Sequence, residues 1–259
     1  MKLPRVATRD EWLKARTDLL RKEKDLTKKR DRLNTERRKL PMVEVDKDYR
    51  FQGPEGEVSL RDMFEGRQQL MIYHFMFAPE WDEGCPSCTA SAEEMSDGLL
   101  DHLHTRDTTY AMVSRAPLEK LETWKSKHGW HVPWYSSFGS DFNYDFGVTI
   151  DESRGSDSYN YRSRKEFEEM GDSFFDSPQP FEMPGLSCFL RDGDTVYHTY
   201  SAFARGIDLA GSTSYYLDLT ALGRQEAWEE PKGRTTALGM QAGGPELRFH
   251  DEYRPEDGA

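Results

Sequence analysis

The apolar residues between residues 8 and 40 recur at every seventh position. Trp12 and the leucines that follow it at this spacing form one narrow line along a helix, and Thr8 and Glu11 have the spacing of a capping box. Pro41 ends the pattern, because proline cannot continue a helix. We therefore expect one helix over residues 8–40. A self-sufficient coiled coil needs two apolar positions per heptad, so we expect this helix to pack on the body of the protein or on a partner subunit.

Short apolar runs replace this pattern after residue 41. The runs Gln68–Phe77 and Thr108–Ser114 are apolar throughout, as in strands that are buried on both faces. Near the C-terminus, the segment "LSCFLRDGDTVYHTYS" predicts a hairpin that turns at Gly193. The strands therefore number at least four and include one antiparallel pair.

Helical segments lie between these strands. One is expected from Cys85 to about Leu103, and another from Pro117 to the closing Gly129. The segment "DLAGSTSYYLDLTAL" is expected to form a last helix or a covering segment. Strands that alternate with helices build a central sheet with right-handed crossovers, so the fold class is α/β.

Composition divides the chain into three parts. Residues 1–40 are expected to form the basic helix, residues 41–225 one α/β domain, and residues 226–259 a polar, glycine-rich tail. Within the domain, residues from about 151 to 183 are polar and irregular, which is typical of an insertion. A short helix is expected there at Arg164–Met170.

The net charge of −12 hides an uneven distribution. Residues 1–40 carry 15 Lys+Arg and 7 Asp+Glu, a net of +8. The whole chain has 35 and 47, which leaves 20 basic and 40 acidic residues, a net of −20, for residues 41–259. Such a body repels nucleic acid. The basic helix could bind nucleic acid, but the overall charge makes us expect no nucleic-acid partner. The basic helix is expected to lie on an acidic surface of this protein, either its own or that of the partner in a homodimer.

The sequence contains no apolar run of membrane-spanning length and no secretory leader at its N-terminus. We therefore expect a cytoplasmic protein without a membrane partner. Thiols stay reduced in that compartment, where a CxxC motif is more often catalytic or metal-binding than a structural disulfide.

Cys85 and Cys88 form such a motif, "CPSC", directly after the first buried strand. Functional groups in open α/β sheets lie beyond the carboxyl ends of the strands. Cys85 would stand at a helix N-terminus, where the dipole favours a thiolate, with Pro86 at the first helical position. Cys85 can then attack a disulfide and Cys88 can resolve the mixed disulfide.

The alternative interpretations of this motif are a metal site and an inert pair. His102 and His104 follow the motif, but they are closer together than the histidines of zinc sites. We therefore expect no metal and no cofactor. Cys188 and His74 lie in apolar runs, so both are expected to be structural, His74 as a hydrogen-bonded core histidine.

The loop before the motif is acidic, with Glu80, Asp82 and Glu83 close to Cys85. Negative charge disfavours a nearby thiolate and offsets the helix dipole. We therefore expect a modestly stabilised thiolate and a reduction potential near the thioredoxin value of about −270 mV. Trp81 in the same loop is a candidate for contact with a client protein.

Several motifs together resemble the bacterial domain of unknown function 899 family: "YHFMFAPEWDEGCPSC", "VSRAPLEKLETWKSKHGW", "SDFNYDFGV", "PGLSCFLRDGDTVYHTYS" and "YYLDLTALGR". That family is classed as thioredoxin-like, near the alkyl hydroperoxide reductase and peroxiredoxin group. The resemblance implies a thioredoxin-like three-layer α/β/α sandwich with an N-terminal helical extension. It places Cys85 and Cys88 at the redox position, and it makes Pro184 the candidate for the substrate-binding cis-proline that faces them.

Three functions follow from these observations. The first is a thiol–disulfide oxidoreductase that acts on a protein or small-molecule disulfide client and is reduced by an electron donor that the sequence does not name. The second is a thiol peroxidase of the peroxiredoxin type, although Asp82 stands where that group has a threonine. The third is a non-catalytic thioredoxin-like module that binds a partner through the basic helix.

Overall fold

The computed structural model describes residues 3–211, 213–224, 226, 228–233, 249 and 252. At its centre, the parallel strands β4 (Gln69–His74) and β5 (Thr108–Ser114) lie side by side. The hairpin of β11 (Gly185–Asp192) and β12 (Thr195–Phe203) adds to the free side of β4, with both pairings antiparallel. Gly193, with φ 58°, makes the predicted turn. A position with positive φ suits glycine because it lacks a Cβ.

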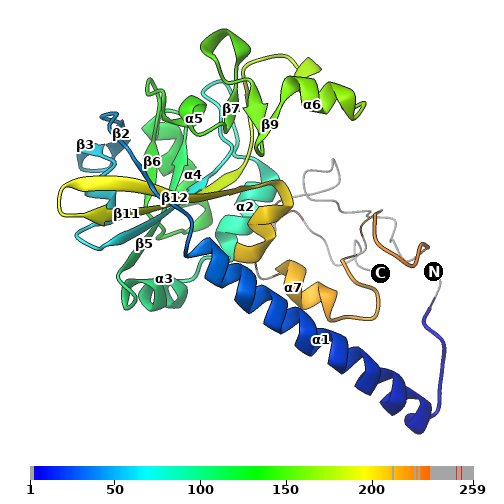
Figure 1. Cartoon of the computed structure of the whole chain (residues 1–259). Coiled ribbons are helices and arrows are strands. Elements are labelled where there is room, and N and C mark those ends of the chain that lie inside the picture. The colour runs from blue at the N-terminus through cyan, green and yellow to red at the C-terminus, as the bar shows by residue number, and fades with distance from the viewer. Residues whose placement is uncertain are drawn as a thin grey trace.

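Shorter strands complete an eight-stranded sheet of order β1-β12-β11-β4-β5-β6-β2-β3, shown in Figure 1. These strands are β1 (Val43–Glu44), β2 (Arg50–Gly53), β3 (Gly56–Ser59) and β6 (Trp134–Ser136). The parallel centre, the antiparallel hairpin and the N-terminal helix confirm the thioredoxin-like α/β prediction.

Side-chain alternation along β4 serves two hydrophobic cores. Tyr73 packs into the core on the face that carries α2 (Pro86–Glu93), α3 (Asp97–His104) and α4 (Leu118–His128). Leu70 and Ile72 pack into the core on the other face, with η1 (Asp62–Phe64) and α5 (Phe142–Asp145). Successive side chains of a strand point to opposite faces, so a strand buried on both faces is apolar throughout. The prediction from that run is confirmed.

The segment after the CxxC motif forms two helices instead of the single helix expected over Cys85–Leu103. Helix α2 ends at Glu93, and α3 begins after Ser96, whose side chain accepts a hydrogen bond from the backbone N–H of Leu99. Serine is a preferred N-cap because its oxygen satisfies a backbone donor that has no intrahelical partner. This local cap explains the break.

Residues 151–183 form a small unit at one end of the sheet (Figure 1). Their regular elements pack around the apolar side chains of Tyr159, Phe167 and Phe175. These elements are η2 (Glu152–Arg154), β8 (Ser158–Tyr159), β9 (Arg162–Ser163), α6 (Arg164–Glu169), η3 (Phe174–Asp176) and β10 (Phe181–Glu182). Strand β10 pairs with β7 (Thr149–Ile150), which directly precedes the unit. Helix α6 agrees with the expected helix at Arg164–Met170.

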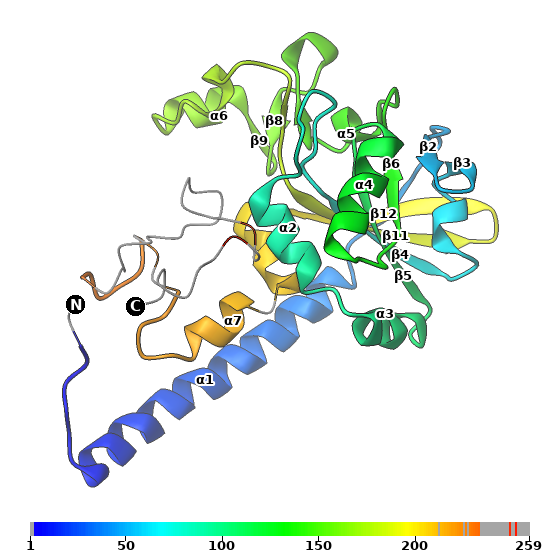
Figure 2. The same ribbon diagram turned by 180° about the vertical axis from the view of Figure 1, so that it is seen from behind.

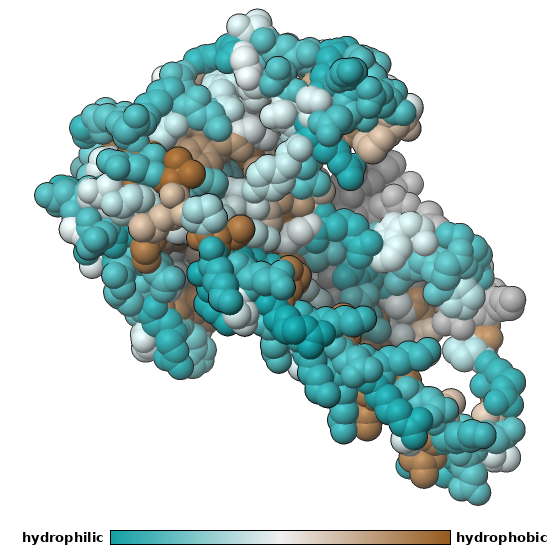
Figure 3. Space-filling model, in the orientation of Figure 1, coloured by the Kyte–Doolittle hydropathy of each residue, from teal (hydrophilic) through white to brown (hydrophobic). Residues whose placement is uncertain are grey.

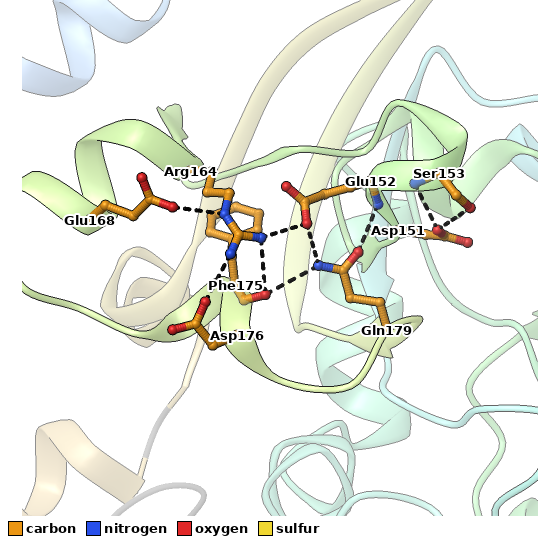
Figure 4. Close-up of polar contacts among 8 residues, drawn as sticks. All are labelled: Asp151, Glu152, Ser153, Arg164, Glu168, Phe175, Asp176 and Gln179. Carbon is orange, nitrogen blue, oxygen red and sulfur yellow. Dashed lines mark hydrogen bonds and ion pairs between the residues drawn. The ribbon is translucent and has the colours of Figure 1, made fainter.

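One arginine connects three segments of this unit (Figure 4). The guanidinium of Arg164 lies 2.6 Å from Glu152, 2.8 Å from Glu168 and 2.8 Å from Asp176. Gln179 also donates to Glu152, at 2.8 Å. Polar side chains thus hold together a segment whose sequence looks irregular.

The N-terminal helix α1 (Arg9–Arg37) extends away from the sheet in both ribbon views (Figures 1 and 2). Thr8 and Glu11 form the predicted capping box. None of the residues of α1 is buried. Arg37, at its C-terminal end, lies over the ring of Tyr200 in β12, 4.8 Å from the centroid. Helix α7 of the same chain lies beside the middle of α1 in both views (Figures 1 and 2). The packing of residues 1–40 on the body as a whole stays a prediction.

The C-terminal part begins with η4 (Ala204–Ala210) and α7 (Thr213–Asp218), in the segment where a helix or cover was expected. The backbone N–H of Thr213 donates to Glu94 at the end of α2, at 2.9 Å. The expected tail, residues 226–259, lies mostly outside the described residues. Across the described chain, no helix combines the length and apolarity that crossing a bilayer requires.

Candidate redox site

Cys85 is the N-cap of α2, and Pro86 occupies its first turn, as the sequence predicted. The backbone N–H of Cys85 donates to the carbonyl of Met76, which follows β4, at 3.1 Å. Gly84 makes this connection possible: a Cβ there would lie 2.8 Å from the ring of Phe75 and 3.0 Å from that of Trp124. The dithiol therefore lies beyond the carboxyl end of β4, where ligand and active sites of open α/β sheets occur.

The local hydrogen bonds favour the thiolate of Cys85. The pKa of its thiol is lowered from 9.0 to about 7, first by a hydrogen bond from the side chain of Cys88 and then by the backbone N–H groups of Cys88 and Ser87 and the Ser87 side chain. Burial acts in the opposite direction. Donors at a helix N-terminus stabilise an anion, so a large fraction of Cys85 is ionised near neutral pH.

Cys88 has the opposite character. It is fully buried, and burial raises the pKa of its thiol well above 9.0, with a further increase from the hydrogen bond to Cys85. Its sulfur accepts a hydrogen bond from the backbone N–H of Met76 at 3.4 Å and one from the hydroxyl of Tyr73. Both cysteines are free in this structure. The pair thus combines one thiol whose pKa is lowered with one buried thiol whose pKa is raised.

The acidic loop does not act on this pair as expected. The side chain of Asp82 is 101% exposed and lies 3.9 Å from Lys120, and Glu83 lies 3.9 Å from Lys127. Neither carboxylate contributes to the shifted pKa of Cys85. Lys120 also donates to the carbonyl of Pro79 at 2.9 Å, which holds the loop against α4. The expected effect of these two carboxylates on the Cys85 thiolate is therefore not seen, and the reduction potential near the thioredoxin value stays a prediction.

A cavity of about 190 Å³ adjoins Cys88 between α2, the loop of Pro184 and η4. Its walls are largely apolar and include Met76, Tyr110, Leu186 and Ile207. The structure thus brings Pro184 to the dithiol, as the family resemblance implied. The cis peptide bonds in the described chain precede Pro180 and Pro231, so Pro184 follows a trans bond and differs from the cis-proline of thioredoxins.

The remaining sequence candidates lie elsewhere. Trp81 is partly buried in the loop before the dithiol and packs against the core of the α2 face, outside the lining of this cavity. Cys188 is in β11, where burial raises the pKa of its thiol to about 11. His74 is buried, with Nε2 2.8 Å from Ser187 Oγ, which confirms a hydrogen-bonded core histidine.

The expected absence of a metal has no direct test here. Among the residues that the structure describes, no three His, Cys, Asp or Glu side chains gather at one point. His102 and His104 both lie on α3, beyond the break after α2.

The sequence interpretation missed Tyr73, Ser87 and the buried pair of Arg115 and Glu182. The alternation of side chains along β4 places Tyr73 on the face of α2, so its contact with the dithiol had a usable signal. Arg115 follows β5 at the same sheet edge as the dithiol. Its partner Glu182 is 67 residues away and had no such signal.

The solved structures that resemble this one include thiol peroxidases. Peroxiredoxin Q from Xanthomonas campestris is 13% identical in sequence, with a TM-score of 0.42, and the match covers 66% of this chain and 92% of that chain. Peroxidoxin BcpB from Mycobacterium tuberculosis is 14% identical, with a TM-score of 0.42 and coverage of 66% and 93%. A hypothetical protein from Sinorhizobium meliloti is 11% identical, with a TM-score of 0.37 and coverage of 65% and 78%.

No curated protein matches the sequence. The family described as "Bacterial protein of unknown function (DUF899)" matches residues 1–253, which is nearly the whole chain. The motifs around the dithiol, the α4 helix and the β11–β12 hairpin had already indicated this family. The protein belongs to the DUF899 family.

Proposed function

We propose that the protein is a thiol–disulfide oxidoreductase that uses Cys85 and Cys88. The observation that supports this most directly is the asymmetry of the two thiols. Cys85 is partly exposed, and its pKa is lowered to about 7, whereas Cys88 is buried and protonated within hydrogen-bonding contact of it. A nucleophilic thiolate beside a protected second thiol is the arrangement that two-step disulfide exchange requires.

In the first step, the Cys85 thiolate attacks one sulfur of the client disulfide. A mixed disulfide forms, and the other client sulfur leaves as a thiolate that takes up a proton from water. In the second step, Cys88 loses its proton and attacks the Cys85 sulfur. The bond between Cys85 and the client breaks, the client leaves fully reduced, and Cys85 and Cys88 are oxidised to a disulfide.

The hydrogen bonds from Met76 and Tyr73 support the second step, because donors to the Cys88 sulfur stabilise its thiolate. The enzyme disulfide must then be reduced by an external thiol or dithiol donor. We propose a protein or small-molecule disulfide as the client and the cytoplasm as the compartment, because a cytoplasmic dithiol is kept reduced.

Reduction of insulin by dithiothreitol, followed by turbidity, tests this function. The protein should accelerate it, Cys85→Ser should abolish the acceleration, and Cys188→Ser should leave it unchanged. A Cys88→Ser variant should accumulate client bound to Cys85 by a mixed disulfide. The absence of any dependence on Cys85 contradicts the proposal.

Two other results would favour different functions. Rapid peroxide consumption that requires Cys85, without insulin reduction, would favour the thiol peroxidase. Full biological activity of a Cys85→Ser/Cys88→Ser variant would favour a non-catalytic binding module.

A further inference from the structure

We propose that the protein forms an arm-exchanged homodimer. In this dimer the N-terminal arm, defined as residues 3–40, packs on the acidic body of a second copy of the chain, and the arm of the second copy packs on the first. The inference concerns assembly and is independent of the chemistry at Cys85.

The apolar line of α1 is open to solvent along its whole length. Leu19 is 50% exposed, Leu26 66% and Leu33 54%, and Trp12 and Leu40 at the two ends are similarly exposed. Figure 3 shows this helix as a largely hydrophilic rod with hydrophobic residues along one edge. Isolated exposed leucines are ordinary, but apolar side chains that recur at every seventh residue along one face of a helix indicate that this face has a partner.

The N-terminal half of the arm extends beyond its own sheet, although α7 of the same chain lies beside the middle of α1 in both views (Figures 1 and 2). A helix of the 29 residues of α1 is about 43 Å long at 1.5 Å per residue. It leaves the sheet at its C-terminal end and extends away in both views (Figures 1 and 2). Its N-terminal half, with Trp12 and Leu19, is therefore remote from the sheet to which the helix is attached.

Charge favours the body of a second copy, rather than its arm, as the surface that binds the apolar line of α1. Two arms carry +7 each, from 14 Lys+Arg and 7 Asp+Glu in residues 3–40, and repel, and one apolar residue per heptad is too few for a coiled coil between them. Residues 41–259 carry −20 and attract the arm. The Arg16–Glu23 ion pair, at 2.9 Å, lies between Leu19 and Leu20 around the helix, so the apolar face is also charged.

The base of the arm offers apolar surface for this contact. A hollow of about 680 Å³ lies where the arm meets the sheet, lined in part by Leu40, Val43, Tyr161 and Tyr200. Strand β1 pairs with β12 only at Tyr197 and His198. The outer edge of β12 beyond His198 has no strand partner in the described sheet. An incoming arm from a second copy can cover both features.

An exchange between two copies also closes the assembly. Each copy gives one arm and receives one, so the interface is the same on both sides. No unpaired interaction surface is left to recruit a third copy. Nucleic acid is a poorer occupant, because the body repels phosphate and the apolar line has no part in binding it.

Sedimentation or light scattering of the intact protein tests the dimer. We expect a mass of twice the 30.1 kDa of one chain, with dissociation on dilution and at high salt. A Leu19→Gln/Leu26→Gln variant should dissociate at least tenfold more readily. Both positions are exposed, so the variant should keep its far-ultraviolet circular dichroism spectrum. The matched control is Thr17→Gln/Thr35→Gln, on the other side of the helix, which should dimerise as the wild type does.

A wild type that stays monomeric at all concentrations overturns the proposal, as does a Leu19→Gln/Leu26→Gln variant with unchanged dimerisation. A protein in which the C-terminal tail of the same chain covers the apolar line of α1 would stay monomeric in this way. Binding of DNA by the wild type that the leucine substitutions abolish would also count against it.

Carbodiimide crosslinking of mixed ¹⁴N- and ¹⁵N-labelled dimers tests the exchange itself. Crosslinks between arm lysines of one isotope and body carboxylates of the other support it. Crosslinks that join only arm to arm, or only residues of one isotope, overturn it.

Discussion

Arg115, which follows β5, and Glu182 form a buried ion pair, with Arg115 Nε 2.7 Å from Glu182 Oε1. The two side chains are only 10% and 3% exposed. The other carboxylate oxygen accepts a hydrogen bond from Thr149 at 2.8 Å. Burial raises the pKa of Glu182, and the charge of Arg115 lowers it. Because Glu182 precedes Pro184 by two residues, the pair fixes the segment before Pro184 to the carboxyl end of β5.

Arg115→Met should therefore destabilise the protein by about 3–5 kcal/mol, since it leaves a carboxylate buried without its charge partner. Urea denaturation at pH 7 measures the free energy of unfolding. The control is Arg61→Met, which removes an exposed pair with Asp194 at 2.6 Å and should cost at most about 1 kcal/mol. Equal losses for the two variants would show that the buried pair has no special role.

The alkylation rate of Cys85 should rise with pH and level off above a midpoint near 7. The thiolate is the nucleophile, and the pKa of this thiol is lowered to about 7, so the rate falls about tenfold per pH unit below that value. Cys88→Ala should move the midpoint upward, towards 9.0, because the hydrogen bond from Cys88 is the largest cause of the shift. Mass spectrometry of each labelled peptide measures this. Faster labelling of Cys188 would refute the assignment.

Ser87→Ala should also raise the pKa of Cys85, because the side chain of Ser87 contributes a hydrogen bond to its thiolate. The pH dependence of Cys85 alkylation measures this change.

The double substitution Asp82→Asn/Glu83→Gln should leave the pKa of Cys85 unchanged. It should change the reduction potential of the dithiol by no more than about 10 mV. The two carboxylates that it removes lie out in solvent and face Lys120 and Lys127. Equilibration with glutathione buffers gives the potential. A clear rise in the loop variant would restore the role that the sequence alone had indicated.

His74 should make the protein less stable in mild acid. Burial lowers its pKa from 6.5 to about 3, so between these values the unfolded chain binds a proton that the folded protein does not. Its contribution to stability is complete above pH 6.5 and is lost as pH falls towards 3, at up to about 1.4 kcal/mol per pH unit. The free energies of unfolding of the wild type and of His74→Gln, measured by urea denaturation from pH 7 to 4.5, should diverge in this way. His102→Gln, an exposed control, should follow the wild type.

The sequence by itself determined the features that depend on a few adjacent residues. Thr8 and Glu11 cap α1, Gly129 ends α4 with φ 66°, and Pro86 begins α2 after Cys85. Each is a backbone hydrogen bond or dihedral preference that operates within one helical turn. The apolar run of β4 likewise predicted its burial, because both faces of a central strand meet a core. The position of the dithiol followed from these local elements.

Only the tertiary structure decided what surrounds the dithiol. Tyr73 reaches Cys88 and Glu182 reaches Arg115 because packing brings separate segments of chain together, and no local spacing encodes those contacts. The sequence shows that Asp82 carries a charge, but it does not show that the side chain points into solvent, towards Lys120. An exposed side chain turns towards the nearest favourable charge, here Lys120, and solvent screens what remains. The outward course of α1 was equally hidden, since an amphipathic pattern predicts that a helix has a partner without identifying that partner.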